Sequence, residues 1–536
     1  MAFGLDLFHT AIRRGRFDFH DAETIKRLEG MTVVIGNALY STNASVITLS
    51  LKCAAGLIKC PLKNLSKSVP VFISQIINII RQVGSTESEI VQVAFKSLAN
   101  ILRDFPTARA KEKDLVFLLE LLSPDLEDHE RQTAVFTMLR AIVARKFVIP
   151  EIYDIMEKVG EIMVTSQSPH VQEMCRGVLL QFLLDYPQGK GRLHNQMAFF
   201  AKNLSYIYET GRRSVMELMS AVITKFQDAL IYEYADLLFV ALVMVIANDE
   251  SAKCREMSAQ LIKNLYIRLD DERKQLIFSH LHAWATQAAQ VQLVWVSLQI
   301  SGLIVDVAQV EVQPYVGLMM EDLHNALVTS LRFLAKNEEN DGDMNMDVDL
   351  EWKVPYHSLT VLFKVLRVFP DFCTQDTKVS WSWSLVTSHL LFPHAWVRTA
   401  ACRVLGLLFA ALPVTAPRAD LSDDHPASLV GMQDVTKMLS TQLKSENLDE
   451  DLSMQVVKNL FFIGKCFCAM PKATSIAEPP EAMLDDDEIE NQNVDEVPKQ
   501  KDPLSWLFSK LSYQIKSAHI IRRSRTKSNV RLSSVF

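Results

Sequence analysis

The chain has 536 residues, of which 49% are hydrophobic, and it contains only 17 Gly and 19 Pro. Sparse Gly and Pro in so long a chain favour helices over a loop-rich β architecture, and the length suits either several ordinary domains or one long repeat array. The formal net charge of −7 argues against a protein that binds nucleic acid through an overall basic surface.

One helix-length segment gives a template that recurs along the chain. The apolar residues of 171–183 stand at offsets 0, 3, 4, 7, 8, 11 and 12, which form one stripe on a helix. Closer or looser copies begin at anchor residues that are, in chain order, Val46, Ile90, Arg131, Val171, Val215, Cys254, Leu293, Leu359 and Val397. The anchors from Val46 to Leu293 are separated by 39 to 44 residues, which matches the period of HEAT and armadillo repeats.

A second apolar helix-length pattern, such as 71–80, lies between the anchors. Two helices that each carry one apolar face cannot bury it alone, but stacked neighbours complete a common core. We therefore predict an all-α fold, a HEAT/armadillo-like helical-repeat solenoid (alpha-alpha superhelix) with about nine or ten repeats.

Changes of composition divide the array. We predict HEAT-type repeats over 1–335, an acidic disordered insert over 336–352 and further HEAT-type repeats over 353–470. An acidic linker over 471–502 then leads to a basic C-terminal helix and tail over 503–536. The insert and the linker are poor in structure-forming residues, whereas the last segment has seven Lys or Arg and no acid.

The eight cysteines are scattered and lack the paired spacing of a disulfide framework or a zinc site. We expect buried free thiols, with Cys466 and Cys468 both in the core of the last repeat helix. The longest apolar run, 237–247, is far shorter than the ~20 residues that a membrane-spanning helix needs. It predicts a buried helix in a soluble, intracellular protein that does not contact a membrane.

Catalytic signatures are absent from the sequence. It has no GxxxxGK[ST] phosphate loop, no GxGxxG after a strand, no GxSxG elbow and no HExxH pair. His280 and His282 would lie on different faces of a helix, and we expect His394 to cap or pack against the helix that follows it. We therefore predict that the protein is not an enzyme and has no metal site, cofactor or small-molecule substrate.

Two groups of basic residues are candidate RNA contacts. The glycine-rich loop 189–192 supplies Lys190 and Arg192, and Arg212 and Arg213 follow about half a repeat later. The second group lies in the basic tail and comprises Arg522, Arg523, Arg525 and Lys527. The alternatives are a flexible inter-repeat turn for the loop, and a nuclear import signal or a solvated segment for the tail.

Several segments, in order, resemble one family. They are FGLDLFHTAIRRGR (3–16), VARKFVIPEIYDIMEKV (143–159), LLQFLLDYPQGKGRL (179–193), YETGRRSVMELM (208–219), NDESAKCREMSAQLIKNLY (248–266), FPHAWVRTAACRVLGLLFA (392–410), VVKNLFFIGKCF (456–467) and DPLSWLFSKLSYQIKS (502–517). Together they resemble the down-regulated-in-metastasis family, giant HEAT-repeat proteins that form component 20 of the small-subunit processome.

The resemblance implies a nucleolar, and hence nuclear, protein. It implies a scaffold in 18S rRNA processing and small ribosomal subunit biogenesis. The partners that it implies are small-subunit processome proteins, pre-rRNA and U3 small nucleolar RNA. Family members are several times longer, so we expect this chain to correspond to part of their C-terminal region, with an N-terminal edge that stacks on upstream repeats. The alternatives are a HEAT-repeat nuclear transport receptor, or an adaptor for a phosphatase or kinase.

Overall fold

The computed structural model describes residues 1–105, 107–128, 130–339, 352–373, 383–419, 421–443, 450–471, 476–477 and 500–521, with only the backbone of 190, 336–339 and 514–521. These residues divide into two compact units, Met1–Leu269 and Asp270–Phe536.

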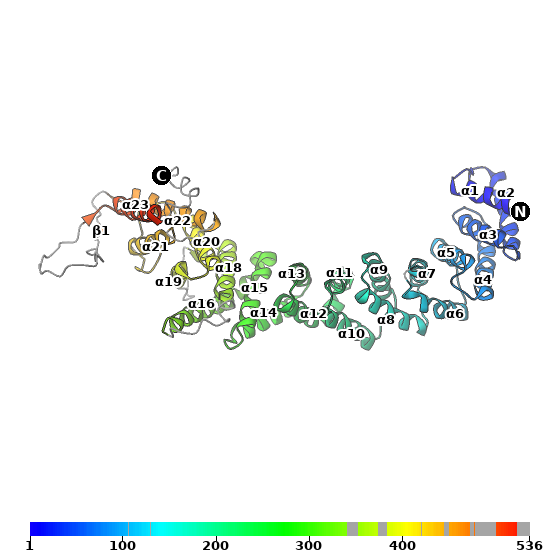
Figure 1. The fold of residues 1–536 in the computed structure, drawn as a ribbon, viewed down its shortest axis with the longest axis horizontal. Coiled ribbons are helices and arrows are strands. Elements are labelled where there is room, and N and C mark those ends of the chain that lie inside the picture. Colours follow the sequence, from blue (N-terminus) through cyan, green and yellow to red (C-terminus); the bar gives the residue numbers. More distant parts are fainter. Residues whose placement is uncertain are drawn as a thin grey trace. The chain divides into compact units, whose positions relative to one another are not determined.

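The first unit is built from helices throughout its described residues (Figure 1). They are α1 (Ala2–Arg13), α2 (Ala22–Ala38), α3 (Ala44–Leu57), α4 (Leu65–Val83), α5 (Glu89–Asp104), α6 (Glu112–Leu122), η1 (Pro124–Leu126), α7 (Gln132–Ala144), α8 (Pro150–Thr165), α9 (Pro169–Asp185), α10 (Lys190–Asn203), α11 (Glu209–Lys225), α12 (Asp228–Asn248) and α13 (Ala252–Ile267).

These helices form two rows. In the odd-numbered row, α1 packs on α3, and the contacts continue in order to α13. In the even-numbered row, α2 packs on α4, α6 on α8 and α10 on α12, and most of these helices also pack on the odd-numbered helix that follows them. The anchors that the sequence predicts in this unit lie in the odd-numbered helices or, for Arg131, directly before one. The apolar stripes thus lie on the odd-numbered helices, which we call the inner row of the helical-repeat stack.

Local signals begin and end these helices. The Asn43 side chain accepts hydrogen bonds from the backbone N–H groups of Ser45 (3.0 Å) and Val46 (3.2 Å), which caps α3. Ser251 caps α13 in the same way through the N–H of Cys254. Gly84 ends α4 with a φ of 67°, a left-handed conformation that favours glycine.

The second unit continues the same construction. Its elements are α14 (Asp271–Ala285), α15 (Val291–Ala308), η2 (Gln309–Tyr315), α16 (Val316–Glu339), α18 (Lys353–Val368), η3 (Pro370–Cys373), α19 (Trp383–Ser388), η4 (His389–Leu391), α20 (Ala395–Ala411), α21 (Leu429–Gln442), α22 (Glu450–Cys468), β1 (Ile476–Ala477), β2 (Gln500–Lys501) and α23 (Pro503–Ile521).

In this unit, α15, α18, α20 and α22 pack on one another in order and form the inner row. The helices α14, α16, α19 and α21 pack beside them. The anchors Leu293, Leu359 and Val397 lie in α15, α18 and α20. The helix α23 covers α21 and α22, and β1 and β2 form a short antiparallel pair. The predicted all-α HEAT/armadillo-like fold is therefore confirmed.

Parts of the predicted acidic insert, acidic linker and basic tail lie outside the described residues. They are 340–351 of the insert, 472–475 and 478–499 of the linker, and 522–536 of the tail. The boundaries that composition assigns to these three segments stay predictions.

Seven of the eight cysteines are buried, as the sequence predicts, but Cys468 is exposed. The expectation that both Cys466 and Cys468 belong to the core is therefore wrong for Cys468. Residues two apart on a helix point in nearly opposite directions, so burial of Cys466 turns Cys468 to solvent. Burial also raises the pKa of the Cys402 thiol to about 12.

By length and composition alone, α12 and the segment Val291–Ala335 are apolar enough to cross a membrane. Within their most apolar windows, however, 50% and 61% of the residues are buried inside the structure. Core helices of repeat proteins pass the same test, so this feature is weak evidence for a membrane span.

Candidate functional site

The loop before α10 carries the first pair of candidate RNA contacts, and tyrosine side chains hold it. The Tyr153 hydroxyl donates a hydrogen bond to the carbonyl of Pro187 (2.9 Å). Tyr186 is buried, and its hydroxyl donates to the carbonyl of Phe147 (3.1 Å). The Arg192 guanidinium lies over the Tyr153 ring, 4.3 Å from its centroid. The loop is therefore pinned to α8, and Arg192 stays exposed beside it.

Lys190 is the first residue of α10, and its side chain lies outside the described part of the structure. The loop joins α9 to α10, two helices, as the sequence predicts. A nucleotide-binding loop of the kind that follows a strand is thus excluded at this position.

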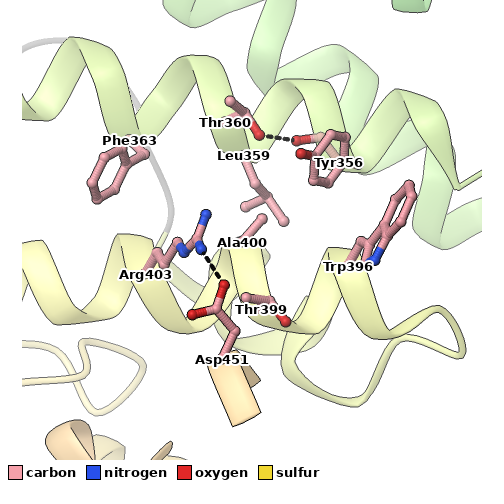
Figure 2. Close-up of a pocket in the computed structure, with 9 residues that line it drawn as sticks. All are labelled: Tyr356, Leu359, Thr360, Phe363, Trp396, Thr399, Ala400, Arg403 and Asp451. Atoms are coloured by element: carbon pink, nitrogen blue, oxygen red, sulfur yellow. Dashed lines mark hydrogen bonds and ion pairs between the residues drawn. The ribbon is translucent and has the colours of Figure 1, made fainter. Parts of the chain in front are cut away.

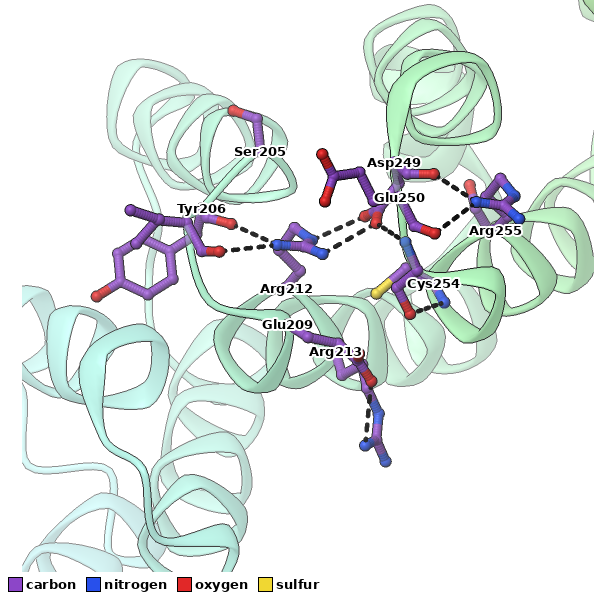
Figure 3. A network of polar contacts seen from close by, with 12 residues as sticks. Ser205, Tyr206, Glu209, Arg212, Arg213, Asp249, Glu250, Cys254 and Arg255 are labelled. Carbon is purple, nitrogen blue, oxygen red and sulfur yellow. Dashed lines mark hydrogen bonds and ion pairs between the residues drawn. The ribbon is translucent and has the colours of Figure 1, made fainter.

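Arg212 is held by bonds within the fold (Figure 3). Its Nε and Nη2 atoms donate to the two carboxylate oxygens of Asp249 at 2.7 and 2.9 Å, and its Nη1 donates to the carbonyls of Tyr206 (2.9 Å) and Ile207 (3.2 Å). The Arg212 side chain is 14% exposed and that of Asp249 is 4% exposed. Arg212 therefore ties the start of α11 to the loop after α12, and its donors are largely used there.

Arg213 points away from Arg212 in Figure 3 and is 33% exposed, with an ion pair to Glu209 at 3.8 Å. Both arginines lie within the first five residues of α11, whereas Arg192 lies in the first turn of α10. Because α10 packs on α11 and a short loop joins them, the two starts are separated by the length of α10, about 20 Å at 1.5 Å per residue. The structure does not bring the two pairs into one patch.

Arg212 belongs to a repeated arrangement that the apolar template does not reveal. At the start of several inner-row helices, a Gln or Arg side chain donates a hydrogen bond to the backbone carbonyl six residues earlier. The pairs are Gln92–Thr86, Gln132–Leu126, Gln172–Ser166, Arg212–Tyr206, Arg255–Asp249 and Arg398–Phe392, at 2.6 to 2.9 Å. The first four donors follow one another at steps of 40 residues, a signal that was available in the sequence.

Polar side chains at these helix starts also link successive repeats. Arg131 donates to Asp125 (2.8 Å) in its own repeat and to Glu87 (3.0 Å) in the repeat before it. Gln172 donates to the carbonyl of Thr210 (3.3 Å) in the repeat after it. Such bonds satisfy loop carbonyls that the helices leave unpaired, so this ladder of polar residues is structural.

The described residues contain no group of three or more His, Cys, Asp or Glu side chains that could hold a metal ion. His282 pairs with Asp322 across α14 and α16, with 2.7 Å between Nδ1 and Oδ1. Burial raises the pKa of Asp322 to about 6. His394 accepts a hydrogen bond from the backbone N–H of Trp396 (3.3 Å), which confirms its predicted capping role.

The remaining candidate RNA contacts lie in the tail. Arg522, Arg523, Arg525 and Lys527 are all outside the described residues. The structure thus supplies geometry for Arg192, Arg212 and Arg213 alone, and RNA contact by any of the eight residues stays a prediction.

Comparison with solved structures finds other helical-repeat proteins. A crystal structure of importin beta aligns with 83% of this chain and 58% of its own length, at 12% identity and a TM-score of 0.37. A crystal structure of a Kap121p mutant aligns with 82% of this chain and 42% of its own length, at 10% identity and a TM-score of 0.40. No family model matches the chain.

Two curated proteins show closer relationships in sequence. The U3 small nucleolar RNA-associated protein 20 of Schizosaccharomyces pombe is 35% identical over 447 residues, or 83% of this chain. The protein of the same name from Saccharomyces cerevisiae is 28% identical over 465 residues, or 86% of this chain. Each alignment spans 17% of the relative's length. The predicted resemblance is therefore confirmed: most of this chain is homologous to a segment of U3 small nucleolar RNA-associated protein 20.

Proposed function

We propose that this chain is a non-catalytic scaffold segment of the small-subunit processome. In this role it acts in 18S rRNA processing and in biogenesis of the small ribosomal subunit, in the nucleolus, and it binds pre-rRNA, U3 small nucleolar RNA and assembly factors. The single observation that carries the proposal is 35% identity over 83% of the chain to a U3 small nucleolar RNA-associated protein.

The geometry is compatible with a scaffold. Two rows of helices, joined by short loops, present extended surfaces of the kind that helical-repeat proteins use for large partners. The pairing of His282 with Asp322 holds two helices together, and the part of the chain that the structure describes has no group of three or more His, Cys, Asp or Glu that could hold a metal ion.

Co-purification tests the proposal. The tagged full chain is expressed in cells and recovered from a nucleolar extract, and its bound RNA and protein are identified. We expect pre-rRNA, U3 small nucleolar RNA and processome proteins. Recovery of a Ran-type GTPase would support a transport receptor instead, and recovery of a phosphatase or kinase would support an adaptor. A chain that brings down neither RNA nor processome proteins contradicts the proposal.

For direct RNA contact, we propose the loop residues Lys190 and Arg192, the neighbouring helix start with Arg213, and the basic tail. Each phosphate contact steepens the salt dependence of binding by about 0.7–0.9 in log–log slope. Charge reversal at Arg192 is expected to reduce that slope by this amount. Reversal of Arg27 is the matched control, because Arg27 lies in α2 of the same helix row, is 78% exposed and pairs with Glu23.

A further inference from the structure

A hollow lies on the inner row of the second unit, where α18, α20 and α22 meet (Figure 2). Its first chamber has a volume of about 250 Å³ and lies between Tyr356 and Phe363 of α18 and Trp396 and Arg403 of α20. Asp451, from the start of α22, closes one side. Figure 2 shows Tyr356 and Trp396 at one end of the chamber, with Phe363 and Arg403 at the other.

A second chamber of about 380 Å³ continues from the first. Phe363 and Arg403 line both chambers, and the second extends along α20 and α22 to Lys458 and Phe462. Gly406 helps to keep the floor open, because a Cβ there would come within 3.3 Å of the Asn459 side chain. The two chambers form one groove, which we call the α20 groove.

The aromatic end of the α20 groove is solvent-exposed and held by stacking. Trp396 is 54% exposed. Its ring packs edge-on against Trp352, with centroids 5.0 Å apart, and Trp352 in turn stacks on His394 at 4.2 Å. Large exposed aromatic side chains with fixed rotamers are typical anchors of protein interfaces, because they bury much apolar area and lose little entropy.

The other end of the α20 groove is cationic. Arg403 is 45% exposed and bonds the Asp451 carboxylate at 2.8 Å. Lys458 is exposed and forms no ion pair with any residue that the structure describes. No acidic side chain lines the second chamber, so Lys458 supplies uncompensated positive charge beside an apolar floor.

The spacing of the two ends fits a short extended peptide. Trp396 and Arg403 are seven residues apart on α20, which corresponds to about 10 Å along a helix. Three residues of an extended segment in the polyproline II conformation cover nearly the same distance, at about 3.1 Å each. Because this conformation has three residues per turn, side chains three positions apart lie on the same side. An apolar side chain and an acidic side chain three residues later would therefore reach both ends together.

We propose that the α20 groove binds an extended peptide segment of a protein partner. An aromatic or aliphatic side chain of this segment packs on Trp396 and Tyr356, and a carboxylate three residues away pairs with Lys458 and Arg403. Charge complementarity selects the carboxylate, and the exposed Trp396 ring with the half-buried Tyr356 ring supplies the apolar contact. The proposal is independent of the proposed processome role.

An RNA backbone fits the α20 groove less well. It would place phosphates beside Asp451, whose side chain is 68% exposed, and like-charge contact opposes binding. Phosphate recognition also relies on several cations in a row, whereas this groove offers two, Lys458 and an Arg403 that is shared with Asp451, which suffice for a single carboxylate.

The test uses the full chain as bait for a phage-displayed random peptide library, followed by fluorescence polarisation with the labelled consensus peptide. We expect a consensus with an apolar or aromatic residue three positions before Asp or Glu. Lys458→Glu is expected to weaken binding of that peptide at least tenfold, and Trp396→Ala to weaken it about tenfold. Lys465→Glu, on the same helix but stacked on Phe461, is the matched control and should stay within twofold.

Thermal melts monitored by circular dichroism accompany each variant. Because the Lys458 side chain is exposed, Lys458→Glu should melt with the parent chain, so a loss of binding reports on the groove. A consensus without an acid, or equal binding by the parent and Lys458→Glu, overturns the proposal. Displacement of the peptide by an oligouridylate, with RNA binding that needs Trp396, assigns the groove to RNA and also overturns it.

Discussion

The ion pair between Arg212 and Asp249 links neighbouring repeats, and we predict that its loss destabilises the helices on either side of it. Replacing Arg212 with Met keeps the aliphatic stem but removes every donor to Asp249 and to the carbonyls of Tyr206 and Ile207. Asp249 is only 4% exposed, so its carboxylate would be left buried without its main partner. Removing one member of a buried pair costs about 3–5 kcal/mol.

We expect a value near the lower limit, about 3 kcal/mol, because Arg212 keeps 14% exposure. Hydrogen exchange with mass spectrometry suits a repeat protein, in which segments open separately. Amides of α12 and α13 should lose about 100-fold in protection, since 1.4 kcal/mol is a factor of ten. Arg213→Met is the adjacent control, and its ion pair at 3.8 Å predicts a change below about 0.5 kcal/mol.

A double-mutant cycle separates the bond from the loss of packing. The N–H of Ser251 donates a hydrogen bond to the Asp249 side chain at 2.8 Å. Asp249→Asn keeps an oxygen that can accept this bond. If the bond carries the effect, adding Arg212→Met to Asp249→Asn should cost at least about 1 kcal/mol less than adding it to the parent chain. Unchanged exchange of α12 and α13 in Arg212→Met, or strict additivity in the cycle, would refute the reasoning.

Three further predictions concern buried groups. Burial lowers the pKa of His389 to about 4, from 6.5, so between these pH values the unfolded chain binds more protons than the folded chain. The contribution of this neutral histidine to the free energy of unfolding is therefore fully present above pH 6.5 and falls by about 3 kcal/mol towards pH 4. Urea melts at pH 6.5 and at pH 4 should show that the free energy of unfolding falls less in His389→Gln than in the parent chain. In Gly431→Ala, the new Cβ would lie 2.0 Å from the His425 carbonyl oxygen, so the midpoint in urea should fall by the equivalent of about 1–3 kcal/mol. Gly317→Ala meets nothing within 4 Å and should leave the midpoint nearly unchanged. A thiol reagent should label Cys468 rapidly in the folded chain, and all eight cysteines only after denaturation; fast labelling of a second thiol would contradict the burial.

The repeat fold could be predicted because apolar spacing is a direct consequence of helix stacking. Val171 and Val178, for example, are two turns apart on one helix face, and both are buried in α9. The inner row therefore leaves its period in the sequence. Capping at Asn43 and His394 is also local, since each cap lies within three residues of the group it binds.

The polar ladder and the α20 groove depend on information that apolar spacing does not carry. Gln172 reaches a carbonyl six residues back and another in the following repeat, and neither contact changes the hydrophobic pattern. The groove brings Tyr356, Trp396 and Lys458 together from three helices. From the sequence, each aromatic residue is equally compatible with a place in the core, as Phe409 shows, which is 2% exposed.

The structure also changes how RNA contact should be tested. Arg192 and Arg212 are both arginines at the start of a helix, and the sequence gives no reason to separate them. Recruiting Arg212 to a phosphate would strip Asp249 of its partner at a cost of several kcal/mol. Arg192 only has to leave the face of the Tyr153 ring, 4.3 Å away, and an exposed contact of that kind is worth about 0.5–1 kcal/mol.

Charge reversal should therefore act differently at the two positions. Arg192→Glu is expected to lower the salt slope of RNA binding by about 0.7–0.9 while hydrogen exchange stays unchanged. Arg212→Glu should reduce protection of α12 and α13 at every salt concentration, because it places a second carboxylate beside Asp249. Binding experiments in which Arg212→Glu lowers the salt slope without loosening these helices would show that the arginine is available to RNA. That result would mean that the bond to Asp249 opens readily in solution.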